Sequence, residues 1–307
     1  MFAVLGEAVV DLAPAGRDGL FAAHPGGSPL NVAVGLARLG RRTAMLARFS
    51  RTALGRRLRD HAATNGVDLD AAVYDDRPAT LAVVSVGDTG AADYDFHLDG
   101  TADWHWTPEE LATLPAGTRV LHTGSLAALL PPGADLVADL LAREYAAGRV
   151  LVSLDPNVRP AMLADPVAAR RRLLALARHA HLVKASDEDL AWLFPGEPVP
   201  TAARRLGEEG VRLVVVTRGA AGSYARTATV EAHHPARRVT VVDTVGAGDA
   251  FTAGLLDALA SAGAVTPGAL DGLTAGQLTA VLDRATTVAA LTCTRAGADP
   301  PHRDDLP

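Results

Sequence analysis

Short apolar runs alternate along the chain with longer stretches in which apolar residues recur every three or four positions. The run Leu213–Thr217 is unbroken and rich in valine, which is typical of a strand buried on both faces. The stretch Ala134–Ala147 has the period of an amphipathic helix. Strands and helices that alternate in this way predict an α/β fold, with a mostly parallel sheet covered by helices on both faces.

The pattern assigns bounds to each predicted element. Strands are predicted at Phe2–Leu5, Thr43–Ala47, Leu81–Val86, Arg119–His122, Val150–Leu154, Leu182–Lys184, Leu213–Thr217 and Val239–Val242. Helices are predicted at Leu30–Leu39, Leu54–Asn65, Ala134–Ala147, Val167–Ala177, Thr201–Glu208, Ala250–Ala260 and Gln277–Leu291. No internal repeat or linker separates them, so the 307 residues are predicted to form one domain.

Two regions, residues 11–24 and 79–106, interrupt this alternation. They have the character of extended, partly polar strands with no helix between them. The second contains Tyr94, Phe96, Trp104 and Trp106, although aromatic residues make up only 4% of the chain. We expect a small antiparallel sheet that covers one end of the main domain.

Composition and charge exclude several classes of protein. The net charge is −6 with no basic run, which argues against nucleic-acid or anionic-membrane partners. The lone cysteine, Cys293, excludes an internal disulfide and a zinc site built from cysteines. The start of the chain has acids where a signal peptide would be apolar, and no apolar run approaches the ~20 residues of a membrane helix. We expect a soluble cytoplasmic protein.

The segment Asp243–Phe251 contains the most informative pattern. It is predicted to run from a buried strand, through a turn containing Gly246 and Gly248, into a helix. The unpaired N–H groups and the dipole at the start of that helix form a site suited to phosphate. An aspartate there, Asp249, suits a base that takes a hydroxyl proton while the N–H groups stabilise a transferring phosphoryl group.

Three other interpretations of this turn exist. Asp249 at a helix start is also what a simple N-cap would need. A Rossmann dinucleotide site would need a third glycine, but Phe251 stands in its place. A Walker A loop is excluded, because the only lysine of the chain, Lys184, does not follow a glycine.

At this point the sequence resembles the ribokinase-like (PfkB) family of carbohydrate kinases, across essentially the whole chain. The segment Asp243-Thr-Val-Gly-Ala-Gly-Asp249 fits the family's C-terminal signature, and Gly26-Gly27-Ser-Pro-Leu-Asn31 fits its N-terminal one. Ser50 departs from the pattern, where the family usually has glycine. The resemblance implies a three-layer α/β/α fold with a small β lid, ATP as donor, Mg²⁺ as cofactor and a sugar-like alcohol as acceptor.

The resemblance also implies roles for individual residues around the transferred group. Asp249 matches the catalytic base, and the anion hole is matched by Gly246, Ala247 and Gly248. The acceptor sugar is expected to contact Asp11, Gly27, Asn31, Phe96 and Arg159. The alternatives are a solvated turn residue for Asp11, a plain helix residue for Asn31, a surface ion pair for Arg159, and lid packing or a dimer seam for Phe96. A homodimer through the lid is therefore a further expectation.

Nucleotide contacts are expected from two loops. The residues are Lys184, Ser186, Thr217, Gly219, Gly222 and, from the glycine turn, Gly248. Asp189 stands where the family has glutamate and is expected to hold a water on Mg²⁺. The alternative is a Ser186 N-cap followed by acids in the first helical turn. Asp243, with backbone near Val245 and Gly297, matches a potassium-type site in relatives, and Pro301 replaces a serine there, which leaves cation activation open.

The acceptor is expected to be fructose, because residues 96–103 and the segment Asp155–Pro160 resemble bacterial fructokinases. Next comes 2-keto-3-deoxygluconate, whose carboxylate Arg159 would pair, and then ribose or a nucleoside. Two other classes of protein remain alternatives to a kinase: a sensor that binds a sugar or nucleotide, and a nicotinamide dehydrogenase. A sensor would not need the base that Asp249 provides.

Overall fold

A computed structural model describes residues 1–16, 19–86 and 92–307. Its main sheet has eight strands in the order β14-β13-β12-β11-β10-β9-β1-β4. Neighbouring strands are parallel except that β13 pairs antiparallel with both β12 and β14. The strands are β1 (Phe2–Leu5), β4 (Thr43–Leu46), β9 (Val120–Gly124), β10 (Leu151–Asp155), β11 (Leu182–Ser186), β12 (Leu213–Thr217), β13 (Ser223–Arg226) and β14 (Glu231–His234).

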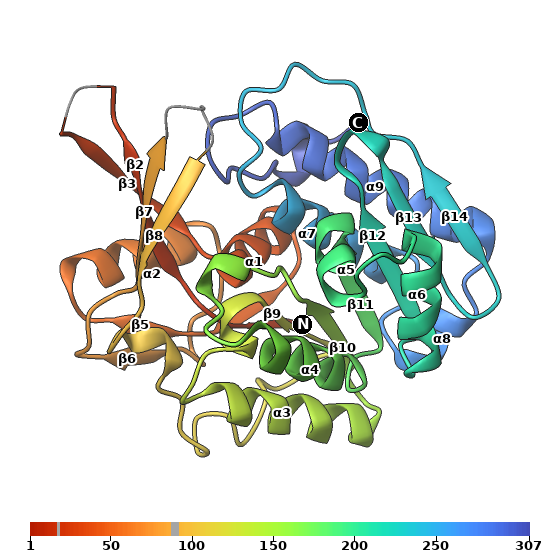
Figure 1. Cartoon of the computed structure of the whole chain (residues 1–307), viewed down its shortest axis with the longest axis horizontal. Helices are drawn as coiled ribbons and strands as arrows, with labels where there is room; N and C mark the ends of the chain where they lie inside the picture. Colours follow the sequence, from red (N-terminus) through yellow and green to blue (C-terminus); the bar gives the residue numbers. More distant parts are fainter. Residues whose placement is uncertain (17–18, 87–91) are drawn as a thin grey trace.

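Helices cover both faces of this sheet (Figure 1). Successive residues of β12 point to opposite faces, so Val215 belongs to one core cluster and Val214 and Val216 to the other. The first cluster includes residues of α1 (Ser28–Arg38), α2 (Ala53–Thr64), α7 (Ala247–Ser261), α8 (Pro267–Asp271) and α9 (Ala275–Thr292). The second includes residues of α3 (Ala134–Ala147), α4 (Pro166–Ala177), α5 (Asp187–Leu193) and α6 (Val199–Glu208). The predicted three-layer fold is confirmed.

A second sheet projects beside the main body (Figure 1). Its four strands have the order β3-β2-β7-β8. They are β2 (Val9–Pro14), β3 (Phe21–Gly26), β7 (Leu81–Val86) and β8 (Ala92–His97). The central pair, β2 and β7, is parallel, so the lid is a mixed sheet and the expectation of a purely antiparallel one is wrong. The reason is that both strands leave the main domain in the same direction.

Only some of the aromatic residues in the predicted lid segment lie in the observed lid sheet. Phe96 lies on β8. Trp104 and Trp106 lie beyond the sheet and are buried, Trp104 in the short 3₁₀ turn η1 (Ala102–Trp104). The side chain of Tyr94 falls outside the described residues.

The predicted strand Val239–Val242 is wrong. The chain between β14 and α7 is irregular, and the side chains of Val241 and Val242 are 58% and 61% exposed. Valine-rich sequence favours a strand, but the segment pairs with none of the strands in the described part of the chain. The N–H of Val242 instead donates to the carbonyl of Cys293, at 2.8 Å. The elements α5, α8, β13 and β14 and the pair β5 (Arg48–Ser50) and β6 (Val73–Asp75) were not predicted as elements.

The topology brings the carboxyl ends of several strands to one edge of the main sheet. The parallel strands β1, β9, β10, β11 and β12 all end there, and ligands of α/β proteins bind at such an edge. The helix α7 begins at this edge and the lid rises from it (Figure 1). Of the helices in the described residues, none is long and apolar enough to cross a membrane.

Candidate active site

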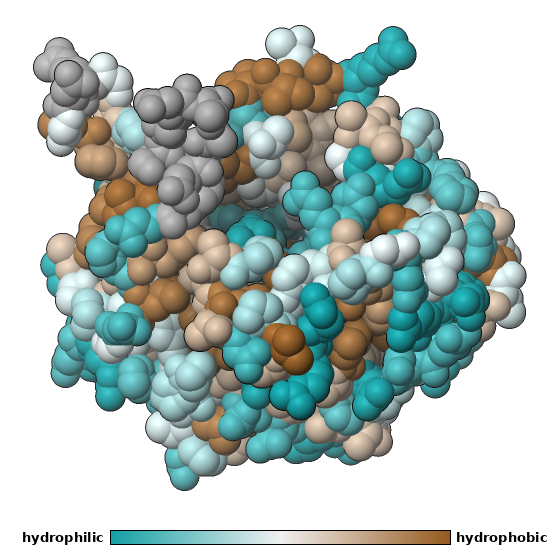
Figure 2. All heavy atoms as spheres, viewed as in Figure 1, coloured by the Kyte–Doolittle hydropathy of each residue, from teal (hydrophilic) through white to brown (hydrophobic). Residues whose placement is uncertain are grey.

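A pocket of about 430 Å³ lies between the lid, the strand ends and the start of α7. Figure 2 shows the surface hollowed beside the lid, with hydrophilic residues inside the hollow. The polar and charged side chains that line it are those of Glu7, Asp11, Ser28, Asn31, Ser125, Asn157, Arg159, Thr244 and Asp249. All five residues that were expected to contact the sugar line this one pocket.

The glycine turn shapes the floor of the pocket. Gly246 caps α7 in the left-handed conformation, with φ of 73°, and a Cβ there would lie 2.6 Å from the Cβ of Ala298. Only glycine satisfies both conditions. The N–H groups of Gly248 and Asp249 donate to no protein acceptor in the described part of the chain, so they are available to an anion. The N–H of Ala247 instead donates to the carbonyl of Thr244, at 3.2 Å, and Ala247 does not line the pocket.

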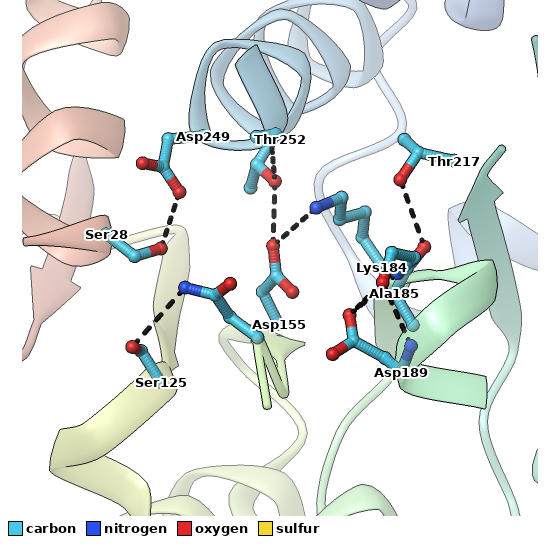
Figure 3. A network of polar contacts seen from close by, with 12 residues as sticks. Ser28, Ser125, Asp155, Lys184, Ala185, Asp189, Thr217, Asp249 and Thr252 are labelled. Carbon is cyan, nitrogen blue, oxygen red and sulfur yellow. Dashed lines mark hydrogen bonds and ion pairs between the residues drawn. The ribbon is translucent and has the colours of Figure 1, made fainter. Parts of the chain in front are cut away.

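Asp249 lies in the first turn of α7 and its carboxylate is held by two side chains of α1. Ser28 Oγ donates to Oδ1 at 2.6 Å, and Asn31 Nδ2 donates to Oδ2 at 2.8 Å. Figure 3 shows Ser28 and Asp249 pointing toward each other across the gap between the two helices. Burial raises the pKa of Asp249, whereas the hydrogen bonds from Ser28 and Asn31 and the charge of Lys184 lower it. The N-cap alternative is wrong, because Gly246 occupies that position.

The lid contributes a second carboxylate. Asp11 lies on β2 and is partly buried, so it is not the solvated turn residue considered as an alternative. Burial and the charge of Asp249 raise the pKa of Asp11 to about 6, although the charge of Arg159 lowers it. Arg159 follows β10, lines the pocket and makes no ion pair among the described residues. Asp11 and Arg159 therefore present opposite charges to the same space.

Gly27 allows the chain to pass closely beneath the lid. Its φ is +100°, and a Cβ there would lie 2.9 Å from the carbonyl oxygen of Glu7. Phe96 reaches the pocket from β8. Asn31 is placed in the pocket as expected, but its amide contacts the expected base directly.

Five further polar residues line the pocket without having been predicted as site residues: Glu7, Ser28, Ser125, Asn157 and Thr244. Burial raises the pKa of Glu7 to about 7, although Ser125 and the N–H of Ala127 donate to its carboxylate. Ser125 and Asn157 have φ of 55° and 38°, and Asn157 Nδ2 lies 3.4 Å from Ser125 Oγ. Non-glycine residues with a positive φ, in the left-handed region of backbone conformation, concentrate at functional sites. Their position directly after β9 and β10 was the available signal in the sequence.

Lys184 lies beneath the glycine turn. Its Nζ is 2.8 Å from Asp155 Oδ2, and Thr252 Oγ1 donates to the same oxygen at 3.2 Å (Figure 3). Burial alone would lower the pKa of Lys184, but Asp155, Asp189 and Asp249 together more than compensate, and the pKa is raised. A Cβ on Gly248 would be 3.4 Å from Nζ, so this buried cation is directly behind the expected anion hole.

Ser186 and Asp189 form the capping box of α5. Asp189 Oδ2 accepts from both the N–H and the hydroxyl of Ser186 at 2.8 Å, and its Oδ1 accepts from the N–H of Val158 at 2.7 Å. This is the helix-cap alternative considered from the sequence, and both carboxylate oxygens of Asp189 accept hydrogen bonds from the protein. The expected contacts of Ser186 with ATP and of Asp189 with a magnesium-bound water stay predictions.

The other residues that were expected to contact the nucleotide lie at the end of β12, next to β11, and in the turn that follows β12. Thr217 ends β12, and its hydroxyl lies 3.4 Å from the carbonyl of Ala185. Gly219 and Gly222 flank the following turn with φ of +50° and +87°. A Cβ on Gly222 would lie 2.1 Å from the carbonyl of His234, so this position requires glycine. None of these residues lines the pocket of about 430 Å³, in contrast to Gly248.

Asp243 joins the segments that were expected to surround a monovalent cation. Its Oδ1 accepts from the N–H of Val245 at 3.0 Å and its Oδ2 from the N–H of Gly297 at 2.8 Å. The described residues contain no cluster of three or more His, Cys, Asp or Glu side chains that could hold a metal ion.

The fold, the lid and the carboxylate beside a glycine turn together define a small-molecule kinase. The sequence matches the pfkB family carbohydrate kinase over residues 1–305, and the chain belongs to this family. It is 38% identical over 316 residues to a fructokinase of Klebsiella pneumoniae, which covers 99% of this chain and 97% of that protein.

Two solved structures extend the comparison. A fructokinase of Xylella fastidiosa with bound ATP superposes with a TM-score of 0.89 at 28% identity, covering 100% of this chain and 94% of the other. A fructokinase of Vibrio cholerae O395 with fructose, ADP and calcium bound superposes with a TM-score of 0.84 at 28% identity, covering 97% and 94%. The expected family and fold are confirmed.

Proposed function

We propose that this carbohydrate kinase transfers the γ-phosphoryl group of ATP to a hydroxyl group of fructose. The observation that carries the proposal is the carboxylate of Asp249, which is held by Ser28 and Asn31 at the junction of a polar pocket and a helix N-terminus. The similar proteins named fructokinases support fructose as the acceptor.

The sugar occupies the pocket beneath the lid. Asp11 accepts hydrogen bonds from two sugar hydroxyls, since a carboxylate has acceptor sites for both. Asn31 and the backbone at Gly27 hold the sugar from below, Phe96 covers it from the lid, and Arg159 lies between the sugar and the transferring phosphate. The pocket of about 430 Å³ suits a small ligand of this kind.

Phosphoryl transfer then depends mainly on positioning and on charge. Asp249 accepts the proton of the attacking hydroxyl group. The free N–H groups of Gly248 and Asp249 and the dipole of α7 stabilise the negative charge that builds on the phosphoryl oxygens. Lys184, directly behind Gly248, adds a buried positive charge. The nucleotide extends from this turn toward Thr217, Gly219 and Gly222.

One acceptor atom at the site fits Mg²⁺. Asp155 Oδ1 is buried and has no hydrogen-bond partner among the described residues, whereas the oxygens of Asp189 accept from the protein. Asp155 would hold Mg²⁺ through a water molecule, with Asp189 further out. When bound, Mg²⁺ neutralises charge on the phosphate oxygens. Asp243, with the backbone near Val245 and Gly297, would hold an activating potassium ion.

The composition and surface of the protein support a cytoplasmic location and a homodimer as parts of this proposal. A free cysteine and a net charge of −6 support work in the reducing cytoplasm. Leu20 and Phe21, at the tip of the lid, are 52% and 51% exposed, which supports a homodimer through the lid.

The test is a coupled assay of ADP release with fructose, 2-keto-3-deoxygluconate and ribose as acceptors. We expect fructose to give the highest kcat/KM. A higher kcat/KM with another sugar would assign that sugar instead. Sugar binding without stimulated ADP release would contradict the kinase and favour a sensor.

A further inference from the structure

We propose that Ser28 is a positioning residue that fixes the carboxylate of the catalytic base, Asp249. This inference rests on the proposed function, because it gives a role to a residue that acts through that base. Ser28 itself would not need to contact the sugar or the phosphate.

The hydrogen bond between the two residues is short and spans two distant segments. Ser28 Oγ lies 2.6 Å from Asp249 Oδ1, and the residues are 221 positions apart in the sequence. An ionised carboxylate offers only acceptors, so the serine hydroxyl donates. Bonds of this kind to a charged oxygen are roughly twice as strong as neutral ones.

The backbone on either side restricts where the Ser28 side chain points. Gly27 before it has φ of +100°, and Pro29 after it has a fixed φ. The α1 helix also approaches α7 closely, because a Cβ on Gly35 would lie 2.7 Å from the Cβ of Ala253. The hydroxyl is therefore held against the base by the packing of two helices.

The two carboxylate oxygens have different partners and therefore different uses. Asn31 Nδ2 donates to Oδ2 at 2.8 Å. Asn31 and Ser28 both line the pocket, and because Asn31 is also a proposed sugar contact, we assign Oδ2 as the oxygen that receives the hydroxyl proton. Ser28 engages only Oδ1 and keeps the carboxylate plane in place while the proton moves to Oδ2.

Charged groups from several elements surround this base. Asp155 on β10 disfavours the ionised form of Asp249, and so does Asp11 on β2. Lys184 on β11 favours the ionised form, as do the hydrogen bonds from Ser28 and Asn31 on α1. Arg159 after β10 acts on Asp11. The hydrogen bond from Ser28 lowers the pKa of Asp249, whereas burial and the two neighbouring carboxylates raise it. Removal of the Ser28 hydroxyl therefore raises the pKa of Asp249.

The experiment compares Ser28→Ala with Ser28→Thr and with a matched control. The control is Ser261→Ala, which removes a serine hydroxyl from the opposite end of α7, where it accepts from Arg41 Nη2 at 2.6 Å. The measurements are kcat, KM for fructose and the pH profile of kcat. Thermal unfolding of each variant shows whether it is folded.

We expect Ser28→Ala to lower kcat about tenfold at neutral pH. KM for fructose should change less than about twofold, and the acidic limb of the profile should move to higher pH by about one unit. Ser28→Thr retains the hydroxyl and should restore most of kcat. Ser261→Ala should resemble the unmodified enzyme.

A Ser28→Ala variant with normal kcat and an unchanged pH profile would overturn the inference, and so would a Ser28→Thr variant as impaired as Ser28→Ala. Either result leaves the proposed function intact, because the unmodified enzyme still phosphorylates fructose. Absence of fructose-stimulated ADP release from the unmodified enzyme would overturn both.

Discussion

At the scale of single residues, the pocket brings together acids whose surroundings differ. Asp249 has two hydrogen-bond donors and a nearby lysine to favour its charged form. Asp11 has only Arg159 to oppose burial and a neighbouring carboxylate, and its pKa is raised to about 6. Burial nevertheless raises the pKa of both carboxylates, so the roles of base and sugar acceptor follow from their positions, with Asp249 at the start of α7 and Asp11 on the lid.

The first prediction concerns the base. Asp249→Asn keeps the size of the side chain but removes its ability to take a proton, so kcat should fall by a factor of roughly 10²–10⁴. Fructose binding should change little, because the amide still fits the site. Steady-state ADP release and calorimetric titration with fructose measure the two effects. Near-normal turnover would contradict the assignment of the base.

The second prediction concerns sugar binding. Asp11→Asn replaces a charged acceptor with an amide, and loss of a hydrogen bond to a charged group costs about 1.5–3 kcal/mol. KM for fructose should therefore rise about tenfold or more, with a smaller effect on kcat. Asp95→Asn is the control, since Asp95 is an exposed aspartate on the same lid. Equal KM values for the two variants would exclude Asp11 as a sugar contact.

At the scale of elements, one buried aspartate connects the lid to the main domain. Asp103 Oδ1 accepts from the N–H of Ala8, just before β2, at 2.9 Å. Its Oδ2 accepts from the hydroxyl of Thr80, just before β7, at 2.6 Å. Asp103 itself lies in η1, after the chain leaves β8. Three of the chain segments that enter or leave the lid thus meet at one carboxylate.

The third prediction follows from this junction. Asp103→Ala leaves the N–H of Ala8 and the hydroxyl of Thr80 without their acceptor, which should lower the free energy of unfolding by roughly 2–4 kcal/mol. Amide hydrogen exchange should accelerate more in β2 and β7 than in the main sheet. Urea unfolding and exchange mass spectrometry measure these changes, with exposed Asp99→Ala as the control. Uniform acceleration in both sheets would show that the junction has no specific role in the lid.

At the scale of the whole molecule, stability depends on pH through buried groups of opposite sign. Burial raises the pKa of Glu7 to about 7 and that of Asp103 to about 6. The stability from these groups is present at low pH and is lost as pH rises through the raised values. Burial lowers the pKa of His122 to about 3 and that of His181 to about 4, so their contribution grows as pH rises toward 6.5. Variants of single residues separate the contribution of the buried acids from that of the buried histidines.

The fourth prediction isolates Glu7. Glu7→Gln removes the titration, so its stability relative to the unmodified protein should increase between pH 5 and pH 8 by roughly 3 kcal/mol. The midpoints of urea unfolding at both pH values measure this difference. Glu208→Gln, on the exposed side of α6, should show no such trend. A difference independent of pH would contradict the raised pKa of Glu7.

The sequence by itself determined the layered fold and half of the residues that line the pocket. Local periodicity suffices for helices such as α3, because burial of one face requires the 3.6-residue repeat. Turn chemistry is also local: Gly246 has a left-handed conformation that only its own lack of a side chain permits. Asp249 beside that turn could therefore be assigned as a candidate base without knowledge of the fold.

Tertiary structure alone decided which groups meet. Val239–Val242 has the sequence pattern of a strand, yet it joins none of the described sheets, because pairing needs a neighbouring strand as well as a favourable sequence. Packing brings distant segments together, so that Ser28 contacts Asp249. For the same reason, Asp103 joins three of the chain segments that enter or leave the lid. The raised pKa of Glu7 has the same origin, since it depends on burial and on the groups that surround the carboxylate in the folded chain.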